Sequence, residues 1–176
     1  EGAAYLVLET EKKAKAQNKT ILGYLDGYGN ANDAFHQTAS SATGEGSFLA
    51  MQAALNSAKI NAEEVSYINA HGTATENNDL SEGVAIQRIF EENLPNISST
   101  KAFTGHTLAA AGAIEAVFSL LAIQEQKIWP NLNFKAQMPE LNFSPETEIV
   151  PKKIEKVLSN SFGFGGNCSS LLFSAV

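Results

Sequence analysis

The stretch "SSTKAFTGHTLAAAG", Ser98–Gly112, decides how this chain folds and where its chemistry lies. It leads from a short polar loop into a long run of small and apolar residues, which predicts a buried central helix over residues 106–126. The loop carries Lys101 and His106, five residues apart. We expect His106 to be buried at the start of this helix, where desolvation and the helix dipole disfavour the imidazolium. A neutral ring N–H can stabilise a developing negative charge.

A buried lysine must be paired with a carboxylate, because an isolated charge is costly to desolvate. Glu82 is the predicted partner of Lys101. Glu115 interrupts the apolar run "LAAAGAIEAVFSLLAIQ" and needs a polar partner for the same reason. The sequence therefore predicts that polar groups meet at the entrance of the helix.

A second loop, "NAHGTATENNDLSEG" at residues 69–83, follows a short apolar strand, the position at which α/β sheets place functional groups. His71 stands directly after that strand, and Thr73 and Thr75 offer hydroxyls along one side of the loop. Asp79 with Glu82 three residues later resembles a capping box, so a helix is predicted to start at Asp79. From the residues alone, a structural histidine on a capped turn explains this loop equally well.

A third loop, "SNSFGFGGNCSS" at residues 159–170, has three glycines in four positions, at 163, 165 and 166. Such a loop adopts backbone angles closed to other residues and can present bare N–H groups to a ligand. A plain hairpin turn is the alternative, although two phenylalanines suit a solvated tip poorly. Cys168 is interpreted as a small buried residue at the start of a strand.

Periodicity over the remaining residues predicts an α/β fold with a mixed sheet flanked by helices. The predicted strands are residues 3–9, 20–28, 65–70 and 97–101 and the two arms of a terminal hairpin around residues 163–166. The predicted helices are residues 11–18, 46–58, 79–92 and 106–126, and residues 129–150 are expected to be an irregular connection.

Composition limits the partners and the compartment. The 176 residues carry a formal charge of −7 with a pI of about 4.9, so a nucleic acid is an unsuitable partner. The single cysteine excludes an internal disulfide and suits a reducing compartment such as the cytoplasm. No apolar run is expected to span a membrane. The chain starts without methionine inside a strand pattern, as expected for a piece of a longer polypeptide.

Three motifs in this order, "HGT-T", "STK-x-x-TGH" and "NSFGFGG", together with "EGAAYLVLE" and "GYGNANDAFHQTA", resemble the C-terminal half of a β-ketoacyl-[acyl-carrier-protein] synthase of the elongating type, in the thiolase-like superfamily. The resemblance implies a layered fold of two similar halves. Residues 1–19 would end the N-terminal half, and residues 20–176 would form the C-terminal domain with a mostly five-stranded mixed sheet. It also implies that the nucleophilic cysteine lies in the upstream half, so this chain alone is expected to be inactive.

The resemblance implies the following catalytic roles. His71 and His106 would hold the malonyl thioester carbonyl with two N–H groups as carbon dioxide leaves. Lys101 would orient the site through Glu82. Phe164 would gate the site, and its backbone N–H would contribute to an oxyanion hole.

The resemblance also implies ligands and partners. Thr73 and Thr75 would bind the phosphopantetheine arm that arrives on an acyl carrier protein, and no redox cofactor is implied. Partners would be the N-terminal half and a second subunit, in a homodimer or a ketosynthase heterodimer. Some members of the family hold a monovalent sodium or potassium ion, and the matching residues could instead hydrogen-bond with each other and with Lys101. These residues are Asn69, Glu82, Glu115, Ser159 and Asn160.

The residues also bear on three alternatives. A non-catalytic partner of the chain-length-factor type would lack the nucleophile, and Cys168, where the family typically has asparagine, favours an atypical member. The presence of both histidines and of Lys101 favours an enzyme. A serine hydrolase lacks its "GxSxG" motif, and a zinc site lacks a third His or Cys at ligand spacing.

Overall fold

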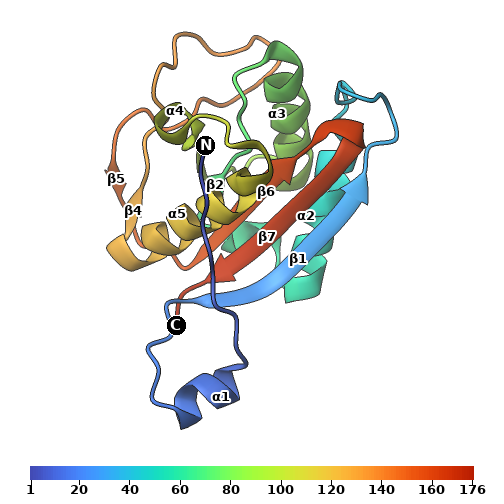
Figure 1. The fold of residues 1–176 in the computed structure, drawn as a ribbon. Coiled ribbons are helices and arrows are strands. Elements are labelled where there is room, and N and C mark those ends of the chain that lie inside the picture. The colour runs from blue at the N-terminus through green and yellow to red at the C-terminus, as the bar shows by residue number, and fades with distance from the viewer.

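The computed structural model describes all residues, 1–176, as a layered α/β structure (Figure 1). One mixed sheet has the strand order β1-β7-β6-β2-β3. Strand β2 runs parallel to β3 and β6, whereas β7 is antiparallel to β1 and β6. The strands are β1 (Tyr24–Asn32), β2 (Tyr67–Asn69), β3 (Asn96–Ser98), β6 (Lys156–Phe162) and β7 (Asn167–Ser174). The predicted five-stranded mixed sheet is confirmed.

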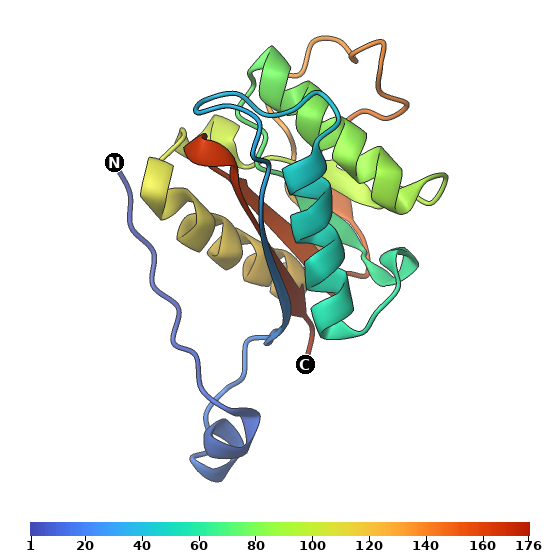
Figure 2. The same cartoon turned by 90° about the vertical axis from the view of Figure 1, so that its right-hand side faces the viewer.

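Helices cover both faces of this sheet. Helices α2 (Glu45–Ala58) and α3 (Glu76–Phe90) lie on one face, and α5 (Ala111–Glu125) lies on the other (Figure 2). The smaller elements are α1 (Glu11–Ala16), α4 (Lys101–Thr104), the β4–β5 pair (Lys127–Ile128 and Val150–Pro151) and 3₁₀ turns at Ala62–Glu64, Leu108–Ala110 and Phe164–Gly166. Residues 129–149 form the irregular connection predicted from their prolines and asparagines.

The sheet is buried on both faces because alternate residues of its central strands face opposite helices. Ile68 and Leu158 are register partners that pack under α2 and α3. Tyr67 and Val157 are the neighbouring partners and pack under α5. The apolar alternation stops at the carboxyl ends of β2 and β6, where the strands continue into polar residues. This change positions the functional site.

Strand β1 approaches α2 unusually closely, and glycines make this possible. A Cβ atom on Gly29 would lie 1.9 Å from the carbonyl oxygen of Ala50, and one on Gly27 would lie 2.3 Å from that of Ala54. Both neighbours are helix backbone atoms that cannot rotate away. The turn-like sequence "GYGNAN" is therefore a strand whose glycines fit the surface of a helix.

Helix α5 is buried on one face only, which corrects the prediction of a helix buried all round. Its buried residues include Glu115, Ala116 and Ser119, whereas Leu121 is 36% exposed. The segment Leu108–Glu125 is long and apolar enough to cross a membrane by length and composition alone, which also corrects the expectation that no such run exists. A core helix of a water-soluble protein meets the same criterion, and α5 packs on the sheet with Glu115 inside the protein.

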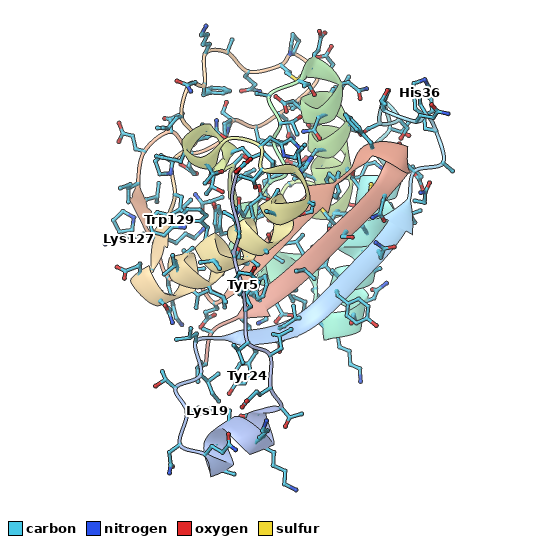
Figure 3. All side chains as sticks on the ribbon, viewed as in Figure 1. Tyr5, Lys19, Tyr24, His36, Lys127 and Trp129 are labelled. Atoms are coloured by element: carbon cyan, nitrogen blue, oxygen red, sulfur yellow. The ribbon has the colours of Figure 1, made fainter.

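The N-terminal residues 1–10 form no strand, so that prediction is wrong. The segment is extended and runs along the outer side of α5 before reaching α1 (Figure 2). Tyr5 and Val7 are 91% and 87% exposed, and Figure 3 shows Tyr5 in front of the sheet and α5. An alternating pattern becomes a strand only when a neighbouring strand supplies hydrogen bonds, and none lies beside this segment.

Helix α3 begins three residues earlier than predicted. Its N-cap is Thr75, whose hydroxyl accepts the backbone N–H of Asn78 at 3.3 Å. Asp79 is therefore inside the first turn, and the predicted capping box of Asp79 with Glu82 is wrong. The side chain of Glu82 instead is buried in the interior of the protein.

We predict that Gly29→Ala lowers the free energy of unfolding by about 3 kcal/mol, because the added methyl group overlaps a backbone atom of α2. Gly163→Ala is the control, since its Cβ would meet nothing closer than 3.7 Å. Urea denaturation followed by circular dichroism measures both. Equal stability of the two variants would contradict the close strand–helix packing.

Candidate active site

The structure brings the two predicted site histidines together although 35 positions (106 minus 71) separate them in the chain. Their ring centroids are 5.3 Å apart and their planes lie at 85°. His71 follows β2 and is 4% exposed, while His106 lies between α4 and the 3₁₀ turn that precedes α5. Phe162, at the end of β6, packs against His71 with a centroid distance of 5.8 Å. Three separate segments therefore converge on one point.

His106 is exposed in this chain, which corrects the expectation of a buried ring. The reason is that residues 102–110 lie at the surface, and the helix starts only at Ala111. Leu108 adopts a left-handed φ of 54°, and its N–H donates to Nδ1 of His106 at 3.2 Å. Because Nδ1 accepts this bond, the proton of the neutral ring lies on Nε2.

Both rings are neutral at pH 7. Burial is the main cause that lowers the pKa of His71 to about 3, and the charge of Lys101 and the proximity of His106 add to it. The pKa of His106 is also lowered, first by partial burial and then by Lys101. A neutral imidazole has one N–H donor, so the pair can offer donors without carrying a charge. Nδ1 of His71 is buried and has no hydrogen-bond partner.

Lys101 forms a buried ion pair with Glu115, which corrects the prediction of Glu82 as its partner. The lysine stands at the start of α4 and the glutamate on the buried face of α5, so the pair ties the loop to the helix. Burial raises the pKa of Glu115, and the attraction of Lys101 opposes that shift. The carboxylate in the apolar run thus has the polar partner that the sequence required.

Glu82 is unavailable to Lys101 because its carboxylate already accepts three N–H donors. Oε1 accepts the backbone N–H of His71 at 2.9 Å and the side-chain amide of Asn160 at 3.1 Å, and Oε2 accepts the N–H of Gly72 at 2.9 Å. Burial raises the pKa of Glu82, and these bonds oppose the shift. Glu82 therefore fixes the backbone that carries His71.

Two serines complete this polar core and were not singled out from the sequence. Ser170 on β7 donates to Oδ1 of Asn160 at 2.8 Å, which turns the amide nitrogen toward Glu82. Ser99 donates to the carbonyl of Gly72 at 3.3 Å, and Gly72, with a left-handed φ of 45°, leaves no room there for a side chain. A single serine carries no sequence signal of its own; only the folded structure shows what Ser170 in β7 and Ser99 after β3 face.

The threonines and the glycine-rich turn border the histidines. The hydroxyls of Thr73 and Thr75 are 3.1 Å apart. Gly165 and Gly166 have φ angles of 79° and 77°, and Phe164 is 80% exposed. The N–H of Gly165 is not free for a ligand, because it donates to the carbonyl of Gln37 at 2.7 Å.

Cys168 is buried in the first residues of β7, as predicted. Burial raises the pKa of its thiol to about 11, a change that the hydrogen bond between this thiol and Ser47 partly offsets. Its sulfur lies 4.0 Å from the Ser47 hydroxyl. A thiol that stays protonated at neutral pH is a poor nucleophile, so Cys168 is a packing residue.

The remaining predicted site residues lie behind the histidines, at the buried ends of β2 and β6. Asn69 pairs in register with Ser159, and its amide nitrogen donates to the carbonyl of Glu115 at 3.2 Å. Two oxygens of this region are buried and accept no hydrogen bond, Oδ1 of Asn69 and Oε2 of Glu115. The five residues predicted around a cation are therefore neighbours.

Two neutral imidazoles beside a buried lysine, at the carboxyl ends of parallel strands, define a site that can stabilise an oxyanion. The family model for the "Beta-ketoacyl synthase, C-terminal domain" matches residues 22–135. The chain belongs to the β-ketoacyl synthase family. This finding confirms the resemblance seen in the motifs. The division of the chain at residues 19 and 20 stays a prediction.

Curated and solved relatives agree with this assignment. The chain is 42% identical to 3-oxoacyl-[acyl-carrier-protein] synthase 2 of Staphylococcus aureus over 180 residues, which cover 98% of this chain and 44% of the relative. The ketosynthase of a type II polyketide synthase, solved in complex with its acyl-carrier protein, matches with a TM-score of 0.89 at 35% identity over 96% of this chain and 42% of that chain. A β-ketoacyl synthase from Burkholderia phymatum STM815 matches with a TM-score of 0.88 at 37% identity over 96% and 41%. The chain thus spans less than half of these relatives.

We predict that Lys101→Met destabilises the fold by about 3–5 kcal/mol, because it leaves Glu115 buried without a partner. The double variant Lys101→Met/Glu115→Leu should recover most of this loss, since it removes both charges. Urea denaturation of the three proteins measures the effect. Wild-type stability of the single variant would show that the ion pair is not desolvated. Lys15→Met, at an exposed pair with Glu11, is the control and should change stability little.

A second prediction concerns acid stability. The pKa of His71 is about 3 in the folded chain against an ordinary 6.5, so below pH 6.5 the unfolded chain binds a proton that the folded chain does not. This group therefore stabilises the fold above pH 6.5, and its contribution falls by about 1.4 kcal/mol per pH unit down to pH 3. Urea denaturation at pH 8, 6 and 5 should show a shallower loss for His71→Gln than for the wild type. Equal slopes would contradict a buried neutral ring.

Proposed function

We propose that this chain is the C-terminal half of an elongating 3-oxoacyl-[acyl-carrier-protein] synthase, which joins an acyl thioester to a malonyl thioester with loss of carbon dioxide. The observation that carries the proposal is the pair of neutral imidazoles, His71 and His106, with centroids 5.3 Å apart beside Lys101. Because the chain spans 44% of the curated relative, the upstream half would supply the nucleophilic cysteine.

The geometry suits a decarboxylative Claisen condensation. The bond between the malonyl carboxylate and its α-carbon breaks, carbon dioxide leaves, and the electron pair moves onto the thioester oxygen as an enolate. N–H groups of His71 and His106 would hold this oxygen, and they need no reorganisation as charge develops. The enolate carbon then attacks the acyl thioester, and the cysteine thiolate of the upstream half leaves.

Lys101 supports this chemistry through its charge. Its ammonium group is held by Glu115. Burial first, and then the charge of Lys101, lowers the pKa of both imidazoles, which favours their neutral forms. A lysine held in an ion pair is not free to attack a thioester. We therefore assign it a supporting electrostatic role, through Glu115 and not through Glu82.

The border of the site suits a phosphopantetheine arm. Thr75 accepts an N–H of α3, so its own hydroxyl proton remains available for a ligand or for Thr73. Phe164 projects from the glycine-rich turn and would gate the entry of the acyl chain, and its backbone N–H would join the oxyanion hole. An acyl carrier protein would deliver the arm, as in the solved complex of a related ketosynthase with its carrier.

A monovalent cation fits the buried region behind the histidines. Oδ1 of Asn69 and Oε2 of Glu115 are buried oxygens without a donor, which is the chemistry that sodium or potassium would satisfy. Asn160 directs its amide nitrogen, not its oxygen, toward Glu82. The ion would therefore be held mainly by Asn69, Glu115 and Ser159, and would neutralise buried charge without entering the reaction.

Exposed apolar side chains on α5 and the N-terminal segment support assembly with an upstream half. Leu121, Tyr5 and Val7 are 36%, 91% and 87% exposed. The complete enzyme would pair as a homodimer or a ketosynthase heterodimer in the cytoplasm. The acidic composition argues against nucleic acid as a partner, and the buried Glu115 argues against a membrane location for α5.

The chain-length-factor alternative is weaker. A non-catalytic partner has no chemical need for two converging neutral histidines and a buried lysine. Cys168, the residue that favoured an atypical member, only packs in β7. The names of the curated relatives also favour the enzyme.

The test uses the complete enzyme. We predict that His106→Ala slows the release of carbon dioxide from malonyl carrier protein by roughly two to three orders of magnitude, the cost of one lost oxyanion donor. His106→Gln, which keeps an N–H donor, should lose less. Labelled carbon dioxide measures both rates. Wild-type decarboxylation by His106→Ala would refute the proposed role.

A further inference from the structure

The segment between β1 and α2, residues 33–44, joins two borders of the active site. Residues 34–38 are all exposed, and Figure 3 shows His36 at the outer tip of this loop. Because few apolar contacts hold it, its position depends on hydrogen bonds to the elements at either side. We call residues 33–44 the strap.

One side of the strap is bonded to the turn that carries Phe164. The N–H of Gly165 donates to the carbonyl of Gln37 at 2.7 Å, and the N–H of Asp33 donates to the carbonyl of Gly166 at 2.8 Å. Asn32 adds a side-chain bond to the carbonyl of Gly165 at 2.9 Å. The strap and the end of β1 are therefore both hydrogen-bonded to this turn.

The other side of the strap is bonded to the first turn of α3. Asn77 makes two reciprocal bonds with Ser40: its Oδ1 accepts the Ser40 N–H at 2.8 Å, and its Nδ2 donates to the Ser40 carbonyl at 3.0 Å. Asn77 stands two residues after Thr75, the N-cap of α3. One side chain thus fastens the strap beside the threonines assigned to the pantetheine arm.

The base of the strap is closed independently. Asp33 accepts the N–H and the hydroxyl of Ser41 and the N–H of Gly46, at 2.6, 2.7 and 2.9 Å. Burial acts to raise the pKa of Asp33, but these bonds outweigh it and the pKa is lowered. The carboxylate keeps the loop ends together, so loss of Asn77 would free the middle of the strap without opening its base.

We propose that Asn77 is a positioning residue that, through Ser40 and the strap, holds the Phe164 turn in place. The threonines assigned to the pantetheine arm and the turn that carries Phe164 would then be connected through the strap. The inference rests on the proposed function for the meaning of the gate, although the connection itself can be measured without condensation.

The experiment is hydrogen–deuterium exchange on the complete ketosynthase. In Asn77→Leu, the amides of the peptide covering Phe162–Asn167 should exchange roughly tenfold faster, the scale expected for the loss of two exposed hydrogen bonds. Asn93→Leu, three residues past the end of α3, is the matched control and should exchange as the wild type does. Asn77→Asp, which keeps the acceptor for the Ser40 N–H, should fall between them. Unchanged exchange of this peptide in Asn77→Leu would overturn the proposal.

Two further measurements separate a shared strap from other causes. A double-variant cycle with Asn32→Leu should be non-additive, because both residues act on the Phe164 turn, Asn32 directly and Asn77 through the strap; additive effects would overturn the connection. In Asn77→Leu, the rate of acyl loading should fall several-fold more than the rate of decarboxylation. Equal losses of the two rates would count against a gate. If β6 amides show that Asn77→Leu unfolds, the same comparison is made with Asn77→Asp. If His106→Ala decarboxylates like the wild type, the proposed function fails, but the exchange measurement still tests the connection between Asn77 and the Phe164 turn. Failure of the proposed function and failure of this inference are therefore distinguishable.

Discussion

The buried ion pair of Lys101 and Glu115 is the interaction on which the rest of the site depends. It places a positive charge beside two imidazoles, whose pKa values are lowered first by burial and then by this charge. It also ties the loop that carries His106 to α5. Since Lys101 is satisfied by Glu115, Glu82 is free to hold the backbone of His71. Glu115 therefore pairs with Lys101, and Glu82 holds the backbone of His71.

This arrangement relies on the parallel pairing of β2 with β6. Parallel strands end at the same edge of a sheet, so Asn69 and Ser159 meet there in register, with Asn160 next in line. Buried polar groups are costly unless they are bonded, and Ser170 and Glu82 supply the partners of Asn160. The site is thus built from the sheet outward, and the borders around Phe164 and Thr73 are added at its edge.

The pattern of apolar residues correctly predicted which residues of the sheet are buried. It overestimated burial at α5 and at residues 1–10. The inner face of α5 packs on β6 and β7, but Leu121 on α5 and Tyr5 in the N-terminal segment stay exposed. A pattern records that a surface avoids water in the working protein, and it does not say which chain provides the cover. The same reasoning explains why His106 is exposed here although its surroundings are apolar in sequence.

The sequence by itself determined the α/β class, the order of most helices and strands, the strand–turn–strand ending, the buried state of Cys168 and the three loops that border the site. These are local properties, since periodicity, glycine and short motifs act over a few residues. Only the tertiary structure decided that Lys101 pairs with Glu115, that Glu82 accepts backbone N–H groups, and that Thr75 caps α3. Choices among several carboxylates or hydroxyls depend on distances between segments far apart in the chain, and such distances exist only once the sheet has formed.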